Sequence, residues 1–372
     1  SNPMNFKYLF FYLLCIFLQN CGQPKKNTSE SDGSKPDFYT IQDFGKVDKI
    51  DAHVHVDTDR PDFIQQAIGD NFRLLTINWD DPNESADMEV QQKFAIMQLK
   101  AFPGQIAYAT TFSVRDFNDT GWEGRTIAYL ENSFAQGAIA VKIYKVIGMD
   151  LKDENGNWVM IDDPRFDPII DFIQANNIPV VGHLGEPKNC WLPLDEMTVN
   201  GDRRYFGKHP EYHMYLHPEA PSYEDQIRAR DNMLRKHPNL MFVGAHLGSL
   251  EWSVDELAKR LDEFPDMAVD MAARIPQLQY QTMKDWQRVR DFMMKYQDRL
   301  IYGTDLSVEP TSDPDGLKKS MHITWTNDWK FFVSNEEMTV SSFVGGFNGL
   351  KLPKEVIEKI YFTNAKKWFP GI

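Results

Sequence analysis

The chain has 372 residues, long enough for one large domain or two ordinary ones, and its apolar content of 42 % is typical of a soluble globular protein. It carries 40 Lys and Arg against 54 Asp and Glu, a formal net charge of −14. This charge disfavours phosphate backbones and anionic membrane surfaces as partners, so we expect no nucleic-acid partner.

Residues 1–21 predict a signal peptide. Lys7 supplies a positive charge, and the apolar run 8–18 that follows is too short to span a bilayer comfortably. The run leads into LQNCG, residues 18–22, which is similar to a loose bacterial lipobox with Cys21 as the lipidated residue. An uncleaved anchor or an ordinary secretory signal is the alternative. We therefore expect a protein secreted to the bacterial cell envelope, periplasmic or outer-membrane, and held at a membrane only by a lipid on Cys21.

Residues 22–37 form a polar Ser, Lys, Gly and Pro tract that predicts a flexible tether, and residues 38–372 predict one folded domain. Of the three cysteines, Cys15 lies in the signal and Cys21 is the lipid candidate. The folded domain then keeps only Cys190, so it has no intrachain disulfide. A small buried packing residue is the preferred interpretation of Cys190.

The first predicted strand lies in DKIDAHVHVD, residues 48–57, which places two histidines one residue apart. Alternate side chains of a strand share a face, so His53 and His55 lie about 6 to 7 Å apart along one side. Ala52, Val54 and Val56 are then expected on the other side. Two imidazoles on one face can converge on a metal ion, although a solvated or hydrogen-bonded pair is the alternative.

Along the rest of the chain, short β-rich apolar runs alternate with amphipathic stretches whose apolar residues recur at three- and four-residue spacing. Eight such alternations predict a single-domain α/β fold, and the strands alone allow a (β/α)8 TIM barrel or a doubly wound sheet. The polar residues at the strand ends favour the TIM barrel. The predicted strands are residues 49–56, 72–78, 105–112, 138–144, 178–184, 240–246, 267–271 and 299–305, and the clearest predicted helices are residues 88–102, 167–177, 223–237 and 253–264.

Potential metal ligands cluster at the ends of these strands. In a barrel, the C-terminal ends of all strands face one mouth, where the chemistry gathers. Imidazole nitrogens and a carboxylate suit a borderline divalent metal such as zinc. The strand-end residues are His53 and His55 on the first strand, Lys142 on the fourth, His183 on the fifth, His246 on the sixth and Asp305 on the eighth.

Several motifs after residue 48 together resemble the amidohydrolase superfamily, in its amidohydrolase 2 branch of metal-dependent hydrolases with the TIM-barrel fold. They follow one another in the family order and cover nearly all of the chain beyond that point. The motifs are IDAHVHV, VKIYK, PVVGHLGEP, HPNLMFVGAHLG, VDMAAR, RLIYGTD and GLKLPKEVIEKIYFTNAKK.

The resemblance implies a ligand set. His53 and His55 would bind the more buried metal with Asp305, whose carboxylate also accepts a proton from the metal-bound water. His183 would complete a mononuclear site or belong to a second one. His246 would be a second-site ligand or a neutral imidazole that polarises the substrate carbonyl. A Lewis-acidic ion lowers the pKa of its water from about 15.7 to about 7, which supplies hydroxide at neutral pH.

Lys142 matches the fourth-strand lysine that is carboxylated and bridges two metals in binuclear members of the superfamily. The number of ions, one or two, depends on this role. The alternative is an ordinary ammonium that binds a substrate anion. Lys145 is a competitor, but strand alternation predicts that the two lysines face opposite sides, and Lys142 lies within the strand proper.

Three further residues are candidates for supporting roles. Glu186 could orient the substrate, or it could be a solvated loop acid. Arg274 could clamp a substrate carboxylate through its planar guanidinium, or form a structural salt bridge to a barrel acid. Asp270 is expected to hold a histidine tautomer rather than to bind metal. The long stretch 187–221, rich in aromatic residues and prolines, could cover the mouth or pack on the barrel rim.

These features together predict a metal-dependent hydrolase that attacks the carbonyl of a small-molecule amide, lactone or ester with a metal-bound hydroxide. A metal-dependent decarboxylase or lyase on the same scaffold is the alternative reaction. A non-catalytic envelope protein that captures a metal or ligand is a third hypothesis, of another class. The expected cofactor is a divalent metal, preferably zinc, as one or two ions.

Overall fold

A computed structural model describes residues 37–84 and 87–372, and Asp37–Ile372 form one compact unit. The predicted signal peptide with Cys21, and the predicted tether up to residue 36, lie outside the described residues. Among the helices of the described part of the chain, we find none that is both long and apolar enough to cross a membrane.

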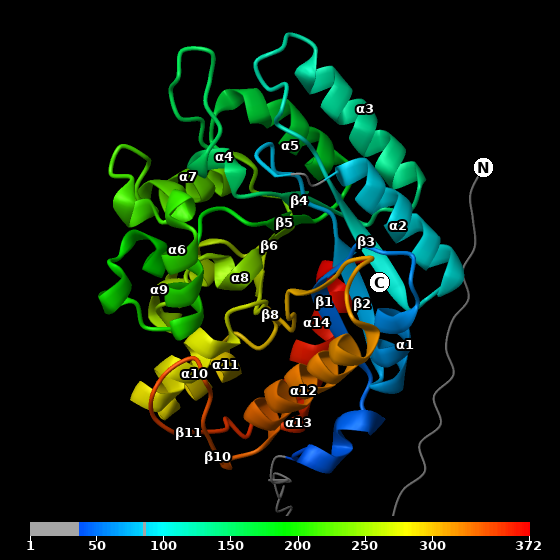
Figure 1. The fold of residues 1–372 in the computed structure, drawn as a ribbon, viewed down its shortest axis with the longest axis vertical. Coiled ribbons are helices and arrows are strands. Elements are labelled where there is room, and N and C mark those ends of the chain that lie inside the picture. The colour runs from blue at the N-terminus through cyan, green and yellow to red at the C-terminus, as the bar shows by residue number, and fades with distance from the viewer. Residues whose placement is uncertain (1–36, 85–86) are drawn as a thin grey trace, which may run out of the picture. The chain divides into compact units, whose positions relative to one another are not determined.

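A single sheet of parallel strands lies at the centre of this unit, with helices around it (Figure 1). Its nine strands follow the order β8-β7-β6-β5-β4-β3-β2-β1-β9, so neighbours in the sequence are neighbours in space. The strands are β1 (Lys49–Val56), β2 (Phe72–Ile77), β3 (Ile106–Thr111), β4 (Ala140–Ile143), β5 (Val180–Gly182), β6 (Phe242–Gly244), β7 (Met267–Asp270), β8 (Leu300–Ile301) and β9 (Leu306–Val308).

The sheet closes through the last strand segment. The eighth predicted strand, 299–305, is interrupted: β8 pairs with β7, and β9 beyond it pairs with β1. Between the two, Asp305 N–H donates to the carbonyl of His53 at 2.8 Å. Asp305 has φ 68°, a left-handed conformation that a regular strand does not accommodate. The predicted TIM-barrel fold is thus confirmed, and its eighth strand bends at the residue expected to carry chemistry.

Helices connect the strands and cover the outside of the sheet. Some of them begin at a capping side chain; Ser222 and Asp225, for example, form a reciprocal capping box at the start of α7. The α-helices are α1 (Asp62–Gly69), α2 (Met88–Ala101), α3 (Trp122–Ala135), α4 (Val146–Met149), α5 (Asp167–Ala175), α6 (Asn200–Lys208), α7 (Tyr223–Lys236), α8 (Ala245–Gly248), α9 (Val254–Glu263), α10 (Ile275–Lys284), α11 (Trp286–Lys295), α12 (Pro314–Val333), α13 (Lys354–Glu358) and α14 (Asn364–Trp368).

Several shorter segments complete the fold. An antiparallel pair, β10 (Glu337–Met338) and β11 (Phe347–Asn348), lies apart from the main sheet. The remaining helical segments, of 3-10 type except for the last, which is a π-helix, are η1 (Ile41–Lys46), η2 (Pro164–Phe166), η3 (Lys188–Trp191), η4 (Leu194–Glu196), η5 (Pro210–Tyr212), η6 (Met214–Leu216) and η7 (Lys359–Thr363).

The interior of the barrel has an apolar lower part and a polar upper part. The apolar part joins small and branched side chains of the strands to the last helix, α14, which contributes Ala365 and Trp368 to the same cluster. The inward positions nearer the C-terminal strand ends are polar, as in Lys142 and Asp270. A packed lower core with a polar mouth is the arrangement that places a site on a rigid support.

β1 departs from simple alternation. A register shift marks a bulge between Asp51 and Val54. Ala52 packs in the interior cluster, whereas Val54 and Val56 pack in the outer layer against the helices. The prediction that these three residues share one face is therefore wrong, because the bulge adds a residue and reverses the alternation. As a result, Ala52 and His53 both turn inward.

Candidate active site

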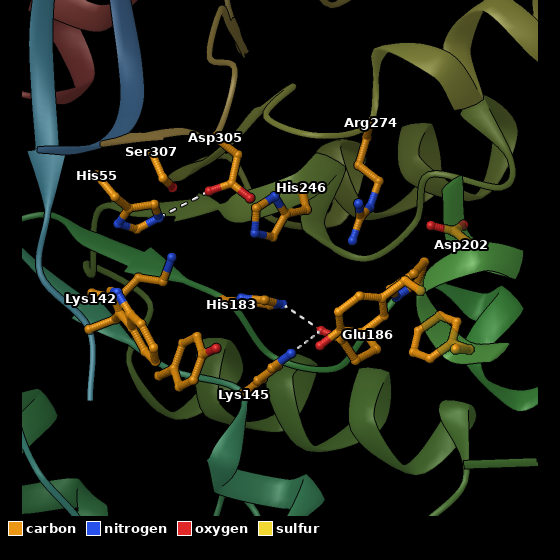
Figure 2. A pocket seen from close by; sticks show the side chains of 15 residues that line it. His55, Lys142, Lys145, His183, Glu186, Asp202, His246, Arg274, Asp305 and Ser307 are labelled. Atoms are coloured by element: carbon orange, nitrogen blue, oxygen red, sulfur yellow. Dashed lines mark hydrogen bonds and ion pairs between the residues drawn. The ribbon is translucent and has the colours of Figure 1, made fainter. Parts of the chain in front are cut away.

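A cavity of about 340 Å³ opens at the C-terminal ends of the strands, and Figure 2 shows the side chains that line it. Five of the six predicted metal-site residues line the cavity; these are His55, Lys142, His183, His246 and Asp305. The sixth, His53, lies just beneath with no exposed surface. All six predicted side chains thus meet at one mouth.

His53, His55 and Asp305 form one tight group, and His53 with His246 and Asp270 forms a second. Asp305 Oδ1 lies 3.0 Å from His55 Nε2 and 3.3 Å from His53 Nε2. The possible ligand atoms of the three residues lie within 4.8 Å of one another. The left-handed backbone of Asp305, anchored on the carbonyl of His53, is what turns its carboxylate toward the two rings. Strain of this kind persists only where the surrounding structure imposes it.

The hydrogen bonds on the far side of both rings determine which nitrogen faces Asp305. Asp270 Oδ2 lies 2.8 Å from His53 Nδ1, and the carbonyl of Ile77 lies 2.7 Å from His55 Nδ1. Because a carbonyl only accepts, the proton of a neutral His55 ring lies on Nδ1. Both Nε2 lone pairs then point at an acceptor carboxylate. A shared cation would satisfy three acceptors this close, so this donor set fits a divalent metal.

The electrostatics of the group agree with this assignment. Burial and the nearby Lys142 lower the pKa of His53, so its ring stays neutral. Burial by itself would raise the pKa of Asp305, but its interactions with the nearby rings of His55, His53 and His246 outweigh burial and hold the pKa well below its usual value. Neutral imidazole and ionised carboxylate are the forms that bind metal.

Lys142 lies at the edge of the same group. Its Nζ lies 3.4 Å from His53 Nε2, and the side chain is buried. Burial lowers the pKa of Lys142 to about 8, against the opposing charges of Asp305 and Asp270. A lysine this close to the candidate ligands competes with a cation as an ammonium, whereas its neutral form does not.

Lys145 also lines the cavity. The prediction that Lys142 and Lys145 face opposite sides is wrong, because β4 ends at Ile143 and strand alternation stops there. Lys145 Nζ lies 3.0 Å from Glu186 Oε1, and this ion pair is largely buried. Burial would lower the pKa of Lys145, but Glu186 outweighs it and raises the pKa above its usual value. Lys145 is therefore a fixed cation in the wall of the cavity.

His183 and Glu186 form a pair within the turn that follows β5. His183 Nε2 lies 3.1 Å from Glu186 Oε1, the oxygen that also meets Lys145. Burial lowers the pKa of His183 to about 3, so the ring is neutral. Burial opposes ionisation of Glu186, but Lys145 and His183 lower its pKa below the usual range. Glu186 is thus a buried, ionised acceptor with one oxygen already bonded twice.

His246 follows β6 in a strained turn. Its φ is 62°, in the left-handed region, and its N–H donates to Asp270 Oδ1 at 2.9 Å. His246 Nδ1 donates to the carbonyl of Ala272 at 2.8 Å, which leaves Nε2 without a proton in the neutral ring. Burial and the neighbouring His183 hold the pKa of His246 well below its usual value. This geometry favours a ligand role over donation to a carbonyl.

Arg274 extends into the cavity from the residues after β7 (Figure 2). Its Nη1 donates to the carbonyl of Ala273, and its Nε, which is buried, has no hydrogen-bond partner among the described residues. The nearest acid, Glu251, lies 4.0 Å away. The buried Nε is turned to Glu251, but Arg274 lines the cavity and so brings a guanidinium within reach of an anion there.

The segment 187–221 reaches over the mouth. Its helix α6 contributes Asp202, Tyr205 and Phe206 to the lining of the cavity. The segment has a small core of its own, in which buried Cys190 packs with Phe206 and its Sγ donates to the carbonyl of Tyr212. The packing role expected for Cys190 agrees with this position. The segment is thus part of the site, because its side chains form one side of the cavity wall.

The Amidohydrolase family model, Amidohydro_2, matches residues 50–371. The chain belongs to this family. The match covers every motif on which the resemblance was based, and the family is enzymatic and uses divalent metals.

Three proteins that are similar to this chain share 13 to 27 % sequence identity with it. Protein YdaY of Escherichia coli (strain K12) is 27 % identical over 103 residues, which are 27 % of this chain and 74 % of that protein. A crystal structure of an amidohydrolase II has 15 % identity and a TM-score of 0.49, over 86 % of this chain and 99 % of the other. The 2,6-dihydroxybenzoate decarboxylase from Rhizobium has 13 % identity and a TM-score of 0.48, over 87 % and 98 %.

Several residues that line the cavity were not predicted from the sequence. Tyr144 directly follows β4 and Ser307 lies in β9, so their position at strand ends was a usable signal. Trp79 likewise follows the end of β2 by two residues. Tyr205 and Phe206 offered no such signal, because they enter the cavity from α6 of the covering segment.

Proposed function

We propose that this amidohydrolase is a metal-dependent hydrolase that acts on the carbonyl of a small-molecule amide, lactone or ester. The observation that carries the proposal is the convergence of His53 Nε2, His55 Nε2 and Asp305 Oδ1 around one position. Zinc is the metal that we expect, since it prefers imidazole and carboxylate ligands, as one or two ions.

When bound, a divalent metal would lower the pKa of a water molecule and polarise the carbonyl. The residues of the chain supply the rest. Asp305 is ionised and its side chain is 32 % exposed, so it can accept a proton from the attacking water and return it to the leaving group. His183 and His246, with ring centroids 4.4 Å apart, offer the lone pairs that a second ion would need.

One wall of the cavity suits a substrate anion. Arg274 places its guanidinium in this wall, whereas the charge of Lys145 is paired with Glu186. Trp79 and Tyr205 add aromatic surface to the cavity lining. We therefore propose a carboxylate-bearing small molecule as the substrate, with Arg274 as its clamp.

A metal-dependent decarboxylase is the second candidate, because the guanidinium of Arg274 equally suits a substrate whose carboxylate is the group that leaves. The two reactions differ in their products. A hydrolase consumes water and releases an acid with an amine or alcohol, whereas a decarboxylase releases carbon dioxide. Product analysis with a panel of small carboxylates, some of which carry an amide, lactone or ester, separates the two.

Metal content is the first test. We expect at least one divalent metal per chain, lost on chelation together with activity and restored by zinc. Lys142→Ala should reduce two ions to one or none if the lysine bridges them, and should leave a single ion in place if it does not. Lys152→Ala, at a lysine outside the cavity, is the matched control. Wild-type protein that binds no divalent metal would refute the proposal.

A further inference from the structure

The histidines at the mouth do not all present the same nitrogen to it. In His53, His55 and His246, Nδ1 is bonded to a carboxylate or carbonyl of the protein, so Nε2 is left for the site. His183 is reversed, because its Nε2 is the nitrogen bonded to the protein, at Glu186. Among these four rings of the described site, His183 alone shares its hydrogen-bond partner, Glu186, with the lysine Lys145.

Glu186 and Lys145 are built into the wall rather than free in the cavity. The side chain of Glu186 is 7 % exposed and that of Lys145 is 15 % exposed. Lys145 Nζ also lies 5.7 Å from the ring centroids of Tyr144 and of Tyr212, which confine it from two sides. Figure 2 shows His183, Glu186 and Lys145 as a continuous chain along one side of the cavity.

The backbone holds Glu186 in reach of both partners. Gly185, between His183 and Glu186, has φ 85°, and a Cβ there would come within 3.1 Å of Gln226. The glycine therefore permits a tight turn against α7 that brings Glu186 back to the ring three residues before it. This turn, and not the spacing of a strand, sets the contact between Glu186 and His183.

We propose that Lys145 and Glu186 are positioning residues that keep the proton of His183 on Nε2. A carboxylate paired with an ammonium can only accept, so the ring must donate from Nε2, and Nδ1 is left as the lone-pair nitrogen. The pair thereby determines which nitrogen of His183 keeps a lone pair for an ion. This inference rests on the proposed metal function for its consequence, but not for the tautomer itself.

The proposal also changes the role expected for Glu186. Oε1 of Glu186 accepts from both Lys145 and His183, at 3.0 and 3.1 Å. This oxygen is therefore held by two partners within the protein. Glu186 is accordingly assigned to the orientation of His183.

The tautomer can be tested in metal-free protein by NMR of 15N-labelled histidines, with the His183 signal assigned from its loss in His183→Gln. We expect His53, His55 and His246 to be protonated at Nδ1 and His183 at Nε2. Glu186→Ala should abolish the preference at His183 alone. Glu196→Ala, at an exposed glutamate of the covering segment, is the control and should leave every tautomer unchanged.

Metal affinity gives the second readout. Glu186→Ala should weaken zinc binding by about 10- to 100-fold, the usual effect of losing the partner of a ligand imidazole. Glu186→Gln keeps an acceptor oxygen and should restore most of the tautomer preference. Lys145→Met by itself leaves the buried carboxylate of Glu186 unpaired, so this single variant could fail to fold. The double variant Lys145→Met with Glu186→Gln removes both charges together and covers that case.

The outcomes separate the two proposals. His183 protonated at Nδ1 in the wild type would overturn the inference, as would a tautomer and a zinc affinity unchanged in Glu186→Ala. If Glu186→Ala changes the KM for substrate but neither the tautomer of His183 nor the zinc affinity, Glu186 binds substrate directly, and the inference is also overturned. Wild-type protein with the expected tautomers but no affinity for any divalent metal would refute the proposed function and leave the tautomer assignment intact.

Discussion

Asp270 connects two of the candidate ligands, and Asp270→Asn tests that connection. One carboxylate oxygen lies 2.8 Å from Nδ1 of His53, and the other accepts the N–H groups of His246 and Ala272 at 2.9 and 3.1 Å. An amide of the same shape has one acceptor and one donor. It can satisfy either His53 or the two backbone donors in their present state, but not both.

Each orientation of the new amide has a definite consequence. If its oxygen faces His53, its NH2 meets two buried N–H groups and leaves them without an acceptor, which costs about 1–3 kcal/mol for each unsatisfied donor. If its NH2 faces His53, the ring must accept at Nδ1 and move its proton to Nε2, where the metal should bind. The loss of this support should weaken metal binding by about 10- to 100-fold, or about 1.4 to 2.7 kcal/mol.

Zinc affinity by competition with a chelating dye, and the free energy of unfolding of the metal-free protein, measure the two consequences separately. Asp270→Asn should lower at least one of them by the stated amount. Asp266→Asn, at an exposed aspartate just before β7, should change neither. A folded Asp270→Asn protein with the zinc affinity and stability of the wild type would refute the assignment of Asp270 as the support of His53 and His246.

Three further predictions follow from the described geometry and from the N-terminal sequence. Asp305→Asn should keep the unfolding midpoint within a few degrees but lower kcat by about 10²-fold or more; full activity would exclude the proton-transfer role. Burial raises the pKa of Glu251 from its usual 4.5 to about 8, so the free energy of unfolding should fall as the pH rises between these values. Glu251→Gln should flatten this pH dependence of stability in denaturation measurements. A variant with the pH profile of the wild type would contradict the prediction. Cys21→Ser should prevent acylation and move the protein from membrane to soluble fractions, whereas unchanged partitioning would favour an ordinary signal or an uncleaved anchor.

Local patterns in the sequence were sufficient to predict the barrel fold and to predict which residues gather at most of the candidate site. A strand of the length and composition of 49–56 must alternate its side chains, so His53 and His55 could be placed together before any fold was known. The positions of Lys142 and His183 followed in the same way, because every barrel strand ends at the same mouth. These inferences depend only on strand periodicity and on the parallel order of the strands.

The same rule failed where the backbone leaves the strand. The bulge in β1 turned Ala52 inward, and the end of β4 at Ile143 let Lys145 enter the cavity beside Lys142. Both depend on how neighbouring strands pair. Pairing is a property of two segments at once, and the periodicity of one segment does not contain it.

The sequence by itself therefore determined the family, the order of strands and helices, and the residues that gather at the mouth. Tertiary structure alone decided which nitrogen each histidine presents, because Asp270, Ile77 and Ala272 reach the rings from other strands or from the residues that follow them. It also decided the pairing of Glu186 with Lys145, since burial makes an ion pair obligatory there. Hydrogen-bond partners and burial arise from packing between distant segments, so they are fixed only when the chain is folded.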